Sequence, residues 1–168
     1  MTRRLVVMRH AKAEAAGPSD FERPLAARGH RDAADAGTWL AGQDIVPDLA
    51  LVSAALRTRE TWEAVAAAAA WDLEADYDRG LYSAEPDTVR DLISASDDAV
   101  GTLVLIGHNP TMALLAQSLG DGAGDPALED RLFSEFPTSA TAVFDHAGSW
   151  ADLGEGTARL VGYHVGRG

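Results

Sequence analysis

The apolar run Leu5–Met8 is the sequence feature that most constrains the fold. Its four consecutive apolar residues show no alternation with polar ones, which is typical of a strand buried on both faces of a parallel sheet. Arg9 and His10 follow this strand directly. Because ligands bind at the carboxyl edge of the strands in open α/β sheets, the sequence predicts a functional role for both residues.

Two further buried strands repeat this arrangement. Leu103–Ile106 leads into a Gly-His-Asn-Pro segment that contains His108, and Leu49–Ser53 is followed within a few residues by Arg57. The carboxyl ends of parallel strands meet at one edge of a sheet, so we expect two histidines and two arginines to lie close together there.

Segments with helical periodicity separate the strands, which predicts one domain over residues 1–168 with a three-layer α/β/α sandwich and a mostly parallel central sheet. The predicted helices are Pro24–Leu40, Leu56–Ala70, one opening at Pro86, and one with Asn109 as N-cap, Pro110 at N1 and Gly120 at C′. In the first helix, Arg28, Arg31, Asp32 and Asp35 are expected to face water. A helical turn around Leu128–Phe133 and two last strands, Ala140–Phe144 and Ala158–His164, complete the prediction.

Composition excludes several classes of function. The formal net charge of −12 disfavours nucleic acid and anionic membranes as partners. No apolar run reaches the roughly 18 residues that span a bilayer, and the apolar run near the amino terminus is too short for a signal-peptide core. The absence of cysteine excludes disulfides and thiolate chemistry. We therefore expect a cytoplasmic protein.

The four candidate residues point to phosphoryl chemistry. Arginines would repel a metal ion, and neither a nucleophile elbow, nor a P-loop, nor a dinucleotide fingerprint is present. Taken singly, Arg57 reads as a surface helix residue and His108 as a helix-entry residue. Together with Arg9 and His10 they suit a phosphate, whose oxygens match guanidinium donors. The nucleophile would then be an imidazole nitrogen, and neither metal nor cofactor is expected.

The motifs resemble those of the histidine phosphatase superfamily, which carries an Arg-His-Gly signature. The closest resemblance is to its short SixA-type phosphohistidine phosphatases. Ala11 stands where the family motif has glycine. The matching segments are Arg9-His10, Ser53–Thr61 (Ser-x-x-x-Arg-x-x-x-Thr), Gly107–Pro110, Arg23–Gly29 and Thr138–Ala140.

This resemblance implies a phosphoglycerate-mutase-like fold and a role for each candidate. His10 would be the nucleophile and carry a transient phosphoryl group. Arg9, Arg57 and His108 would hold the phosphate, with His108 protonated beside the dianion. We expect His10 to donate its Nδ1–H to a backbone carbonyl, which leaves Nε2 free to attack.

The expected substrate is phosphohistidine on a protein, such as a histidine phosphotransfer domain, hydrolysed without a metal ion. A small phosphomonoester such as a sugar phosphate is the alternative substrate, and a phosphate-binding module without turnover is the alternative function. Larger relatives use a carboxylic acid to protonate the leaving group. Glu85 and Asp87 are the only nearby candidates, and both read better as acids at a helix start.

Overall fold

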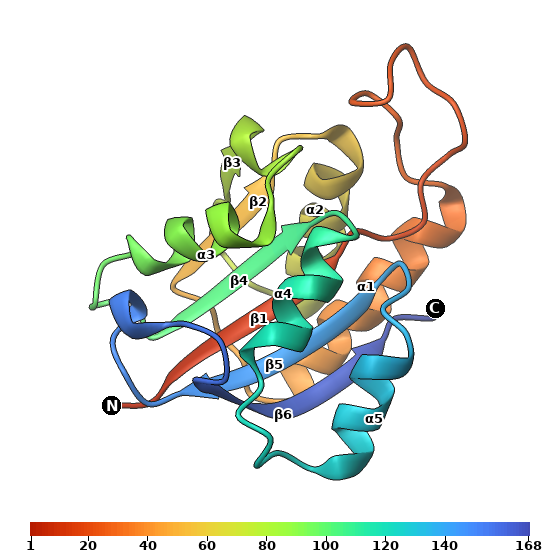
Figure 1. Cartoon of the computed structure of the whole chain (residues 1–168). Helices are drawn as coiled ribbons and strands as arrows, with labels where there is room; N and C mark the ends of the chain where they lie inside the picture. The colour runs from red at the N-terminus through yellow and green to blue at the C-terminus, as the bar shows by residue number, and fades with distance from the viewer.

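The computed structural model describes residues 1–168 and is built around a six-stranded sheet with the order β3-β2-β4-β1-β5-β6 (Figure 1). The pairs β1–β4, β4–β2 and β2–β3 are parallel, and β5 runs antiparallel to both β1 and β6. Only β5 opposes the others, which confirms the predicted mostly parallel sheet. The strands are β1 (Arg3–Arg9), β2 (Leu49–Ser53), β3 (Asp76–Asp78), β4 (Thr102–Gly107), β5 (Ala140–His146) and β6 (Ala158–Val165).

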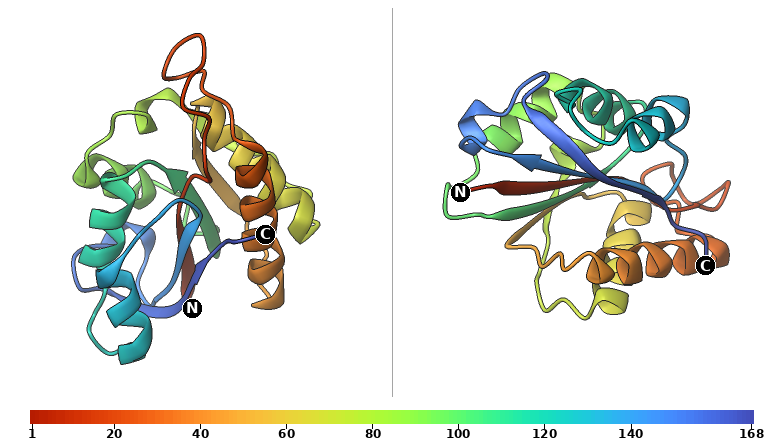
Figure 2. Two further views of the ribbon diagram at one scale, coloured as in Figure 1. Left: turned by 90° about the vertical axis from the view of Figure 1, so that its right-hand side faces the viewer. Right: turned by 90° about the horizontal axis from the view of Figure 1, so that it is seen from below.

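Five helices cover the two faces of this sheet, as Figure 2 shows in the view from below. α1 (Ala27–Gly42) and α2 (Leu56–Ala69) lie on one face. α3 (Pro86–Ser94), α4 (Thr111–Leu119) and α5 (Pro126–Ser134) lie on the other. Alternate residues of β1 enter the two cores, Val6 and Met8 on the side of α1 and α2, Leu5 and Val7 on the opposite side. This double burial explains the unbroken apolar run and confirms the three-layer prediction.

α1 begins at Ala27, so the predicted start at Pro24 is wrong. The backbone N–H of Leu25 donates to Glu60 Oε1 at 2.8 Å, and Ala26 is extended with φ −69° and ψ 160°. A long-range contact therefore holds the preceding residues out of the helix, and local sequence signals do not report such contacts.

Asp32 was predicted to face water, but it is only 1% exposed. Its Oδ1 accepts the backbone N–H of Gly168 at 3.0 Å, and its Oδ2 pairs with Arg28 at 3.3 Å and Arg167 at 3.5 Å. The carboxyl-terminal residues thus pack on α1 and bury a carboxylate that helical periodicity alone places on the outer face.

α4 begins at Thr111, one residue later than predicted. Asn109 Oδ1 accepts the backbone N–H of Ala113 at 3.2 Å, so Asn109 still satisfies a free donor of the first turn. Gly120 is extended, with φ −63° and ψ 131°, rather than left-handed. The predicted C′ conformation is therefore wrong, because the chain leaves α4 as an extended segment that bridges to Ala158.

α5 is longer than the predicted turn at Leu128–Phe133. Asp125 Oδ1 accepts the backbone N–H of Ala127 at 2.9 Å, and Pro126 takes the first helical position. A side-chain cap followed by proline is a strong helix start, and it extends the helix toward its amino end.

The carboxyl ends of β1, β2 and β4 lie at the same edge of the sheet. The loop of residues 10–26, between β1 and α1, projects beyond this edge (Figure 1; Figure 2, left). No helix in the structure combines the length and the apolar character that crossing a membrane requires.

Candidate active site

His10 lies immediately after β1 and is only 9% exposed. Its backbone N–H donates to the Gly107 carbonyl at 3.0 Å, and its carbonyl accepts the N–H of Ser139 at 3.1 Å. Hydrogen bonds to β4 and to the residue before β5 thus fix the backbone of this histidine on both sides.

The ring of His10 is held in a single tautomer. Nδ1 lies 2.7 Å from the carbonyl oxygen of Ala11, and a carbonyl only accepts, so Nδ1 carries the proton. Nε2 forms no hydrogen bond within the protein and is not enclosed by it. The expected Nδ1 contact is therefore present, and Nε2 offers its lone pair outward.

Ala11 fits the position where the family motif has glycine. Its side chain is fully buried, and its backbone lies outside the left-handed region. Its N–H donates to Thr61 Oγ1 at 3.0 Å, and that hydroxyl donates to the Arg57 carbonyl at 2.7 Å. No glycine is required here, and the motif residue Thr61 connects the histidine segment to α2.

Arg57, in the first turn of α2, is buried with 6% exposure. The prediction of a surface helix residue, made for Arg57 in isolation, is wrong. Its two terminal nitrogens donate to Asp20, one to the backbone carbonyl at 2.8 Å and one to Oδ2 at 3.3 Å. Its Nε is buried without a partner. A buried guanidinium with an unused donor is suited to bind an anion.

His108 follows β4 and faces His10, with 5.3 Å between the ring centroids. Its Nε2 lies 2.7 Å from Ser53 Oγ at the end of β2. Its Nδ1 is buried without a hydrogen-bond partner. The structure thus brings the two predicted histidines together at the sheet edge.

Arg9, the last residue of β1, is half-buried. One terminal nitrogen donates to the Phe136 carbonyl at 3.3 Å, and Nε is buried without a partner. Asn109 Nδ2 donates to the same carbonyl at 2.8 Å. The second arginine therefore also retains an unused donor.

The electrostatics of the site favour neutral imidazoles beside permanent cations. Burial, followed by the charges of Arg57 and Arg9, lowers the pKa of His10 to about 4. Burial, followed by repulsion from His10 and Arg57, lowers the pKa of His108 to about 3. Both rings are therefore neutral at pH 7 in the free protein, and the positive charge of the site comes from the two arginines.

Three residues at this edge escaped the sequence prediction of the site: Asp20, Tyr82 and Ser53. Asp20 Oδ1 accepts from Arg23 Nε at 2.9 Å, and its Oδ2 accepts from Arg57 and from the Tyr82 hydroxyl. The Tyr82 ring packs edge-on against the His108 ring at 5.5 Å. Asp20 lies in a polar loop with no periodicity. Its closeness to Arg23 in the sequence is the only feature that could have indicated a role in the site.

Glu85 and Asp87 do not join this cluster. Asp87 pairs with Arg90 at 2.8 Å within α3, and its side chain is 82% exposed. Glu85 is the exposed N-cap residue of that helix and forms no hydrogen bond with the four candidate residues. Both occupy the helix-start positions that the sequence favoured.

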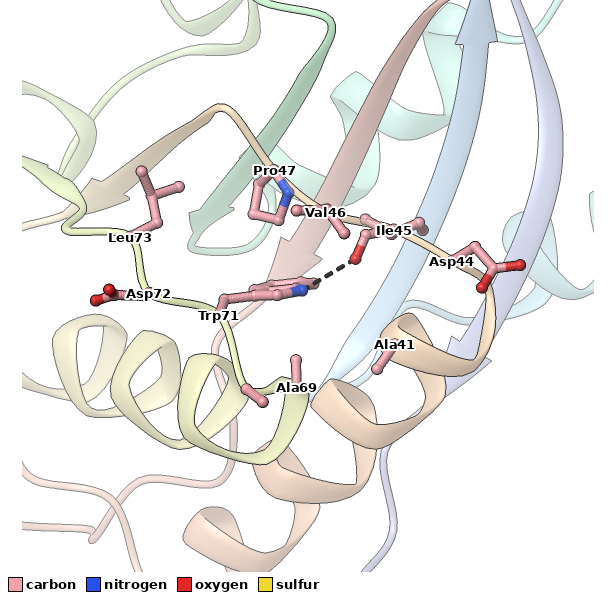
Figure 3. A pocket seen from close by; sticks show the side chains of 10 residues that line it. Ala41, Asp44, Ile45, Val46, Pro47, Ala69, Trp71, Asp72 and Leu73 are labelled. Atoms are coloured by element: carbon pink, nitrogen blue, oxygen red, sulfur yellow. Dashed lines mark hydrogen bonds between the residues drawn. The ribbon is translucent and has the colours of Figure 1, made fainter.

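A separate pocket of about 380 Å³ lies at the opposite edge of the sheet, where the chain enters β2 and leaves α2 (Figure 3). Trp71 Nε1 donates to the Ile45 carbonyl there at 3.0 Å. None of the four candidate residues lines this pocket, so it is separate from the candidate active site.

Comparisons with known proteins identify a family and similar structures. Residues 5–85 match the family described as the histidine phosphatase superfamily (branch 1). An uncharacterised protein of Mycobacterium tuberculosis is 44% identical over 162 residues, which cover 95% of this chain and all of that protein.

Two solved structures are similar over nearly the whole chain. The protein from Nakamurella multipartitia assigned as phosphohistidine phosphatase SixA has a TM-score of 0.85 and 32% identity, with 99% of this chain and 97% of that chain covered. The protein histidine phosphatase SixA in complex with tungstate has a TM-score of 0.77 and 25% identity, with 96% of each chain covered.

Proposed function

This chain belongs to the histidine phosphatase superfamily, and we propose that it hydrolyses phosphohistidine on a protein through a covalent intermediate on His10. Its class of activity is that of a phosphatase of the SixA type. The single observation that carries the proposal is the tautomer of His10, which leaves an unpaired Nε2 beside two arginines with unused donors.

In the first step, Nε2 of His10 attacks the phosphorus atom. A P–N bond to His10 forms while the P–N bond of the substrate breaks, and the electron pair of that bond stays on the leaving imidazole nitrogen. Arg9 and Arg57 contact the equatorial oxygens, where negative charge is spread in the transition state. The buried Nε donors that lack partners are available for these oxygens.

In the second step, water attacks the phosphorus of the phosphorylated His10. The P–N bond breaks, its electron pair returns to Nε2, and inorganic phosphate leaves with both protons of the water as H2PO4−. The hydrogen bond from Nδ1 to the Ala11 carbonyl keeps the ring in place throughout, so the same nitrogen is ready for the next cycle.

His108 supplies the third phosphate contact. It is neutral in the free protein, and a phosphate dianion beside the ring favours its protonated form. The proton would reside on the nitrogen that faces the phosphate, converting a ring that lacks one partner into a charged donor.

Phosphohistidine fits this site better than an alkyl phosphate. An alkoxide needs a proton when it leaves, and the one carboxyl group in contact with the cluster is Asp20, whose pKa is lowered to about 2 by the hydrogen bonds from Tyr82 and Arg23. Asp20 is therefore ionised at pH 7 and does not act as an acid. A protonated imidazole leaves as a neutral molecule and requires no such acid.

A protein substrate has room beside the site. A groove of about 570 Å³ is lined by the loop of residues 16–24 and by the start of α2, including Phe21 and Leu56. Phe21 packs edge-on against Tyr82 at 5.1 Å, so the groove adjoins the cluster. A polypeptide that carries phosphohistidine can rest there.

We also propose that turnover needs no metal ion. The donors gathered at this edge are two imidazoles and two guanidiniums, and no group of three His, Asp or Glu side chains is arranged to hold a metal. The two guanidiniums supply the positive charge that a divalent metal ion supplies in other enzymes that transfer phosphoryl groups.

The proposal is tested by comparing phosphorylated histidine phosphotransfer domain with sugar phosphates as substrates. We expect kcat/KM to be at least about 100-fold higher for phosphohistidine, which is the scale of a general-acid contribution. An acid-labile, alkali-stable phosphoenzyme should be trapped on the wild type. His10→Ala should retain the circular dichroism spectrum and lose both turnover and the trapped phosphate.

The matched control is His30→Ala, which removes an exposed histidine of α1 and should retain full activity. Near-normal turnover by His10→Ala would disprove the nucleophile assignment. Equal rates on sugar phosphates would favour a small-molecule phosphatase, and phosphate binding without turnover would favour a binding module.

A further inference from the structure

The Asp20 carboxylate is the one anionic group in contact with the candidate active site. Its partners come from three segments: Arg57 on α2, Arg23 on the same loop, and Tyr82 after the 3₁₀ turn Arg79–Leu81. His108 is the next titratable group, and the Asp20 charge acts on it in the direction that favours protonation. The carboxylate thus contacts one arginine of the site and acts on one of its two histidines.

Asp20 is held firmly and yet remains open to a ligand. A carboxylate has about four acceptor positions, and three are taken here, by Arg23 on Oδ1 and by Arg57 and Tyr82 on Oδ2. The side chain is 57% exposed. One acceptor position on Oδ1 is therefore left, on a group that solvent reaches.

Asp20 lies beside Arg57, the proposed ligand of the phosphate, and on the solvent side of the site. In phosphoryl transfer the attacking and leaving atoms lie roughly in line on opposite sides of the phosphorus. His10 is buried at the end of β1, whereas Asp20 lies in the loop that projects beyond the sheet edge. Arg57 touches Asp20 and is the proposed ligand of the phosphate, so a departing group passes next to this carboxylate.

We propose that Asp20 accepts a hydrogen bond from the second ring N–H of the leaving imidazole and thereby selects phosphohistidine over phosphate esters. This inference rests on the phosphohistidine activity proposed above. When the second nitrogen is protonated, cleavage of the P–N bond returns its electron pair to the first nitrogen and releases neutral imidazole. Without that proton, the same cleavage would release imidazolate, a far poorer leaving group.

A carboxylate is suited to this task because it stays ionised. The hydrogen bonds from Tyr82 and Arg23 lower the pKa of Asp20 to about 2, so the group accepts the imidazole N–H across the neutral range. An opposite charge within 4–6 Å raises the pKa of an imidazole by about one unit or more. An ester has no such N–H and gains nothing from Asp20.

A purely structural role for Asp20 makes a different prediction. If the carboxylate only positioned Arg57 and Tyr82, its loss would weaken phosphate binding for every substrate alike. The ratio of kcat/KM between a phosphoimidazole and an ester substrate therefore separates the two roles. The pH profile of kcat gives a second, independent measure.

The experiment compares Asp20→Asn with the wild type on phosphoimidazole and on p-nitrophenyl phosphate. Both substrates are small, and the nitrophenolate needs no proton to leave. We expect kcat/KM for phosphoimidazole to fall at least about tenfold, the scale of a hydrogen bond to a charged group, with little change for p-nitrophenyl phosphate. The alkaline limb of kcat for phosphoimidazole should move about one pH unit lower.

Two further variants control this comparison. Glu14→Gln removes an exposed carboxylate from the same loop and should retain wild-type selectivity. Asp20→Glu restores the charge and should recover part of the phosphoimidazole activity. Circular dichroism spectra of all variants establish that the fold is intact.

Equal losses on both substrates, or no loss on either, would overturn the inference and leave Asp20 as a positioning residue or a bystander. Failure of the proposed function looks different. In that case the wild type itself would hydrolyse p-nitrophenyl phosphate but not phosphoimidazole.

Discussion

Acidification from pH 7 to pH 5 should destabilise this protein through His10 and His108, the two histidines of its candidate active site. His10 and His108 are neutral in the folded state because burial lowers the pKa of His10 to about 4 and that of His108 to about 3. In the unfolded chain each ring returns to a pKa of about 6.5. The unfolded state therefore binds protons first as the pH falls, and stability falls with it.

The size of this effect follows from those pKa values. At pH 5 an unfolded histidine is almost fully protonated, whereas the folded rings remain largely neutral. The linkage relation then gives a loss of about 2 kcal/mol for each histidine between pH 7 and pH 5. The stabilisation is fully present above pH 6.5 and is lost progressively as the pH falls toward 4.

Urea unfolding at several pH values between 5 and 7.5 measures this loss. The experiment gives the slope of the free energy of unfolding against pH. The informative quantity is the difference in this slope between the wild type and variants in which glutamine replaces one histidine. His10→Gln and His108→Gln should each reduce the loss of unfolding free energy between pH 7 and pH 5 by about 2 kcal/mol. His30→Gln, at an exposed position of α1, should leave the slope as it is in the wild type.

The comparison between variants matters because carboxylates also titrate near pH 5, and they contribute equally to all four proteins. If the wild type and both active-site variants showed the same slope, the histidines would not be neutral in the folded protein. The electrostatic basis of the proposed nucleophile would then be lost as well.

Three further predictions concern the chemistry. Arg57→Ala should lower kcat/KM by at least about 30-fold, equivalent to about 2 kcal/mol of transition-state stabilisation, whereas Arg31→Ala, at an exposed position of α1, should change it little. A chelator should leave wild-type activity unchanged, and an activity restored by magnesium would contradict the proposed mechanism. Glu85→Gln and Asp87→Asn should leave phosphohistidine hydrolysis unchanged in steady-state assays, and a selective loss on alkyl phosphates would identify a general acid.

Much of the fold could be predicted from the sequence because its strongest signals are local. The apolar runs that became β1, β2 and β4 are buried on both faces, and no other environment suits them so well. The errors occurred where contacts from distant segments decide the conformation. Leu25 is held out of α1 by Glu60, and Asp32 is buried by the carboxyl-terminal residues.

The candidate site was predictable in part for the same reason. Strand ends position Arg9, His10 and His108, so their convergence follows from the parallel sheet alone. The burial of Arg57 does not follow from helical periodicity, because a loop folds over the first turn of α2 and presents Asp20 to it. Loops carry no periodic signal, and the partner of a buried cation is therefore invisible in the sequence.

Asp20 explains how a site built for an anion remains ordered when no substrate is bound. An unpaired buried guanidinium is costly, and the Asp20 carboxylate and carbonyl together satisfy both terminal nitrogens of Arg57. Nε is the one nitrogen of Arg57 without a partner, so a phosphate can bind Arg57 without displacing Asp20. Arg57 then lies between the carboxylate and the phosphoryl group and bonds both, so the two negative charges are separated by a permanent cation. The acceptor position left on Asp20 can take the N–H of a leaving imidazole, and an ester brings no such donor. Asp20 therefore favours phosphohistidine and leaves ester hydrolysis unaffected.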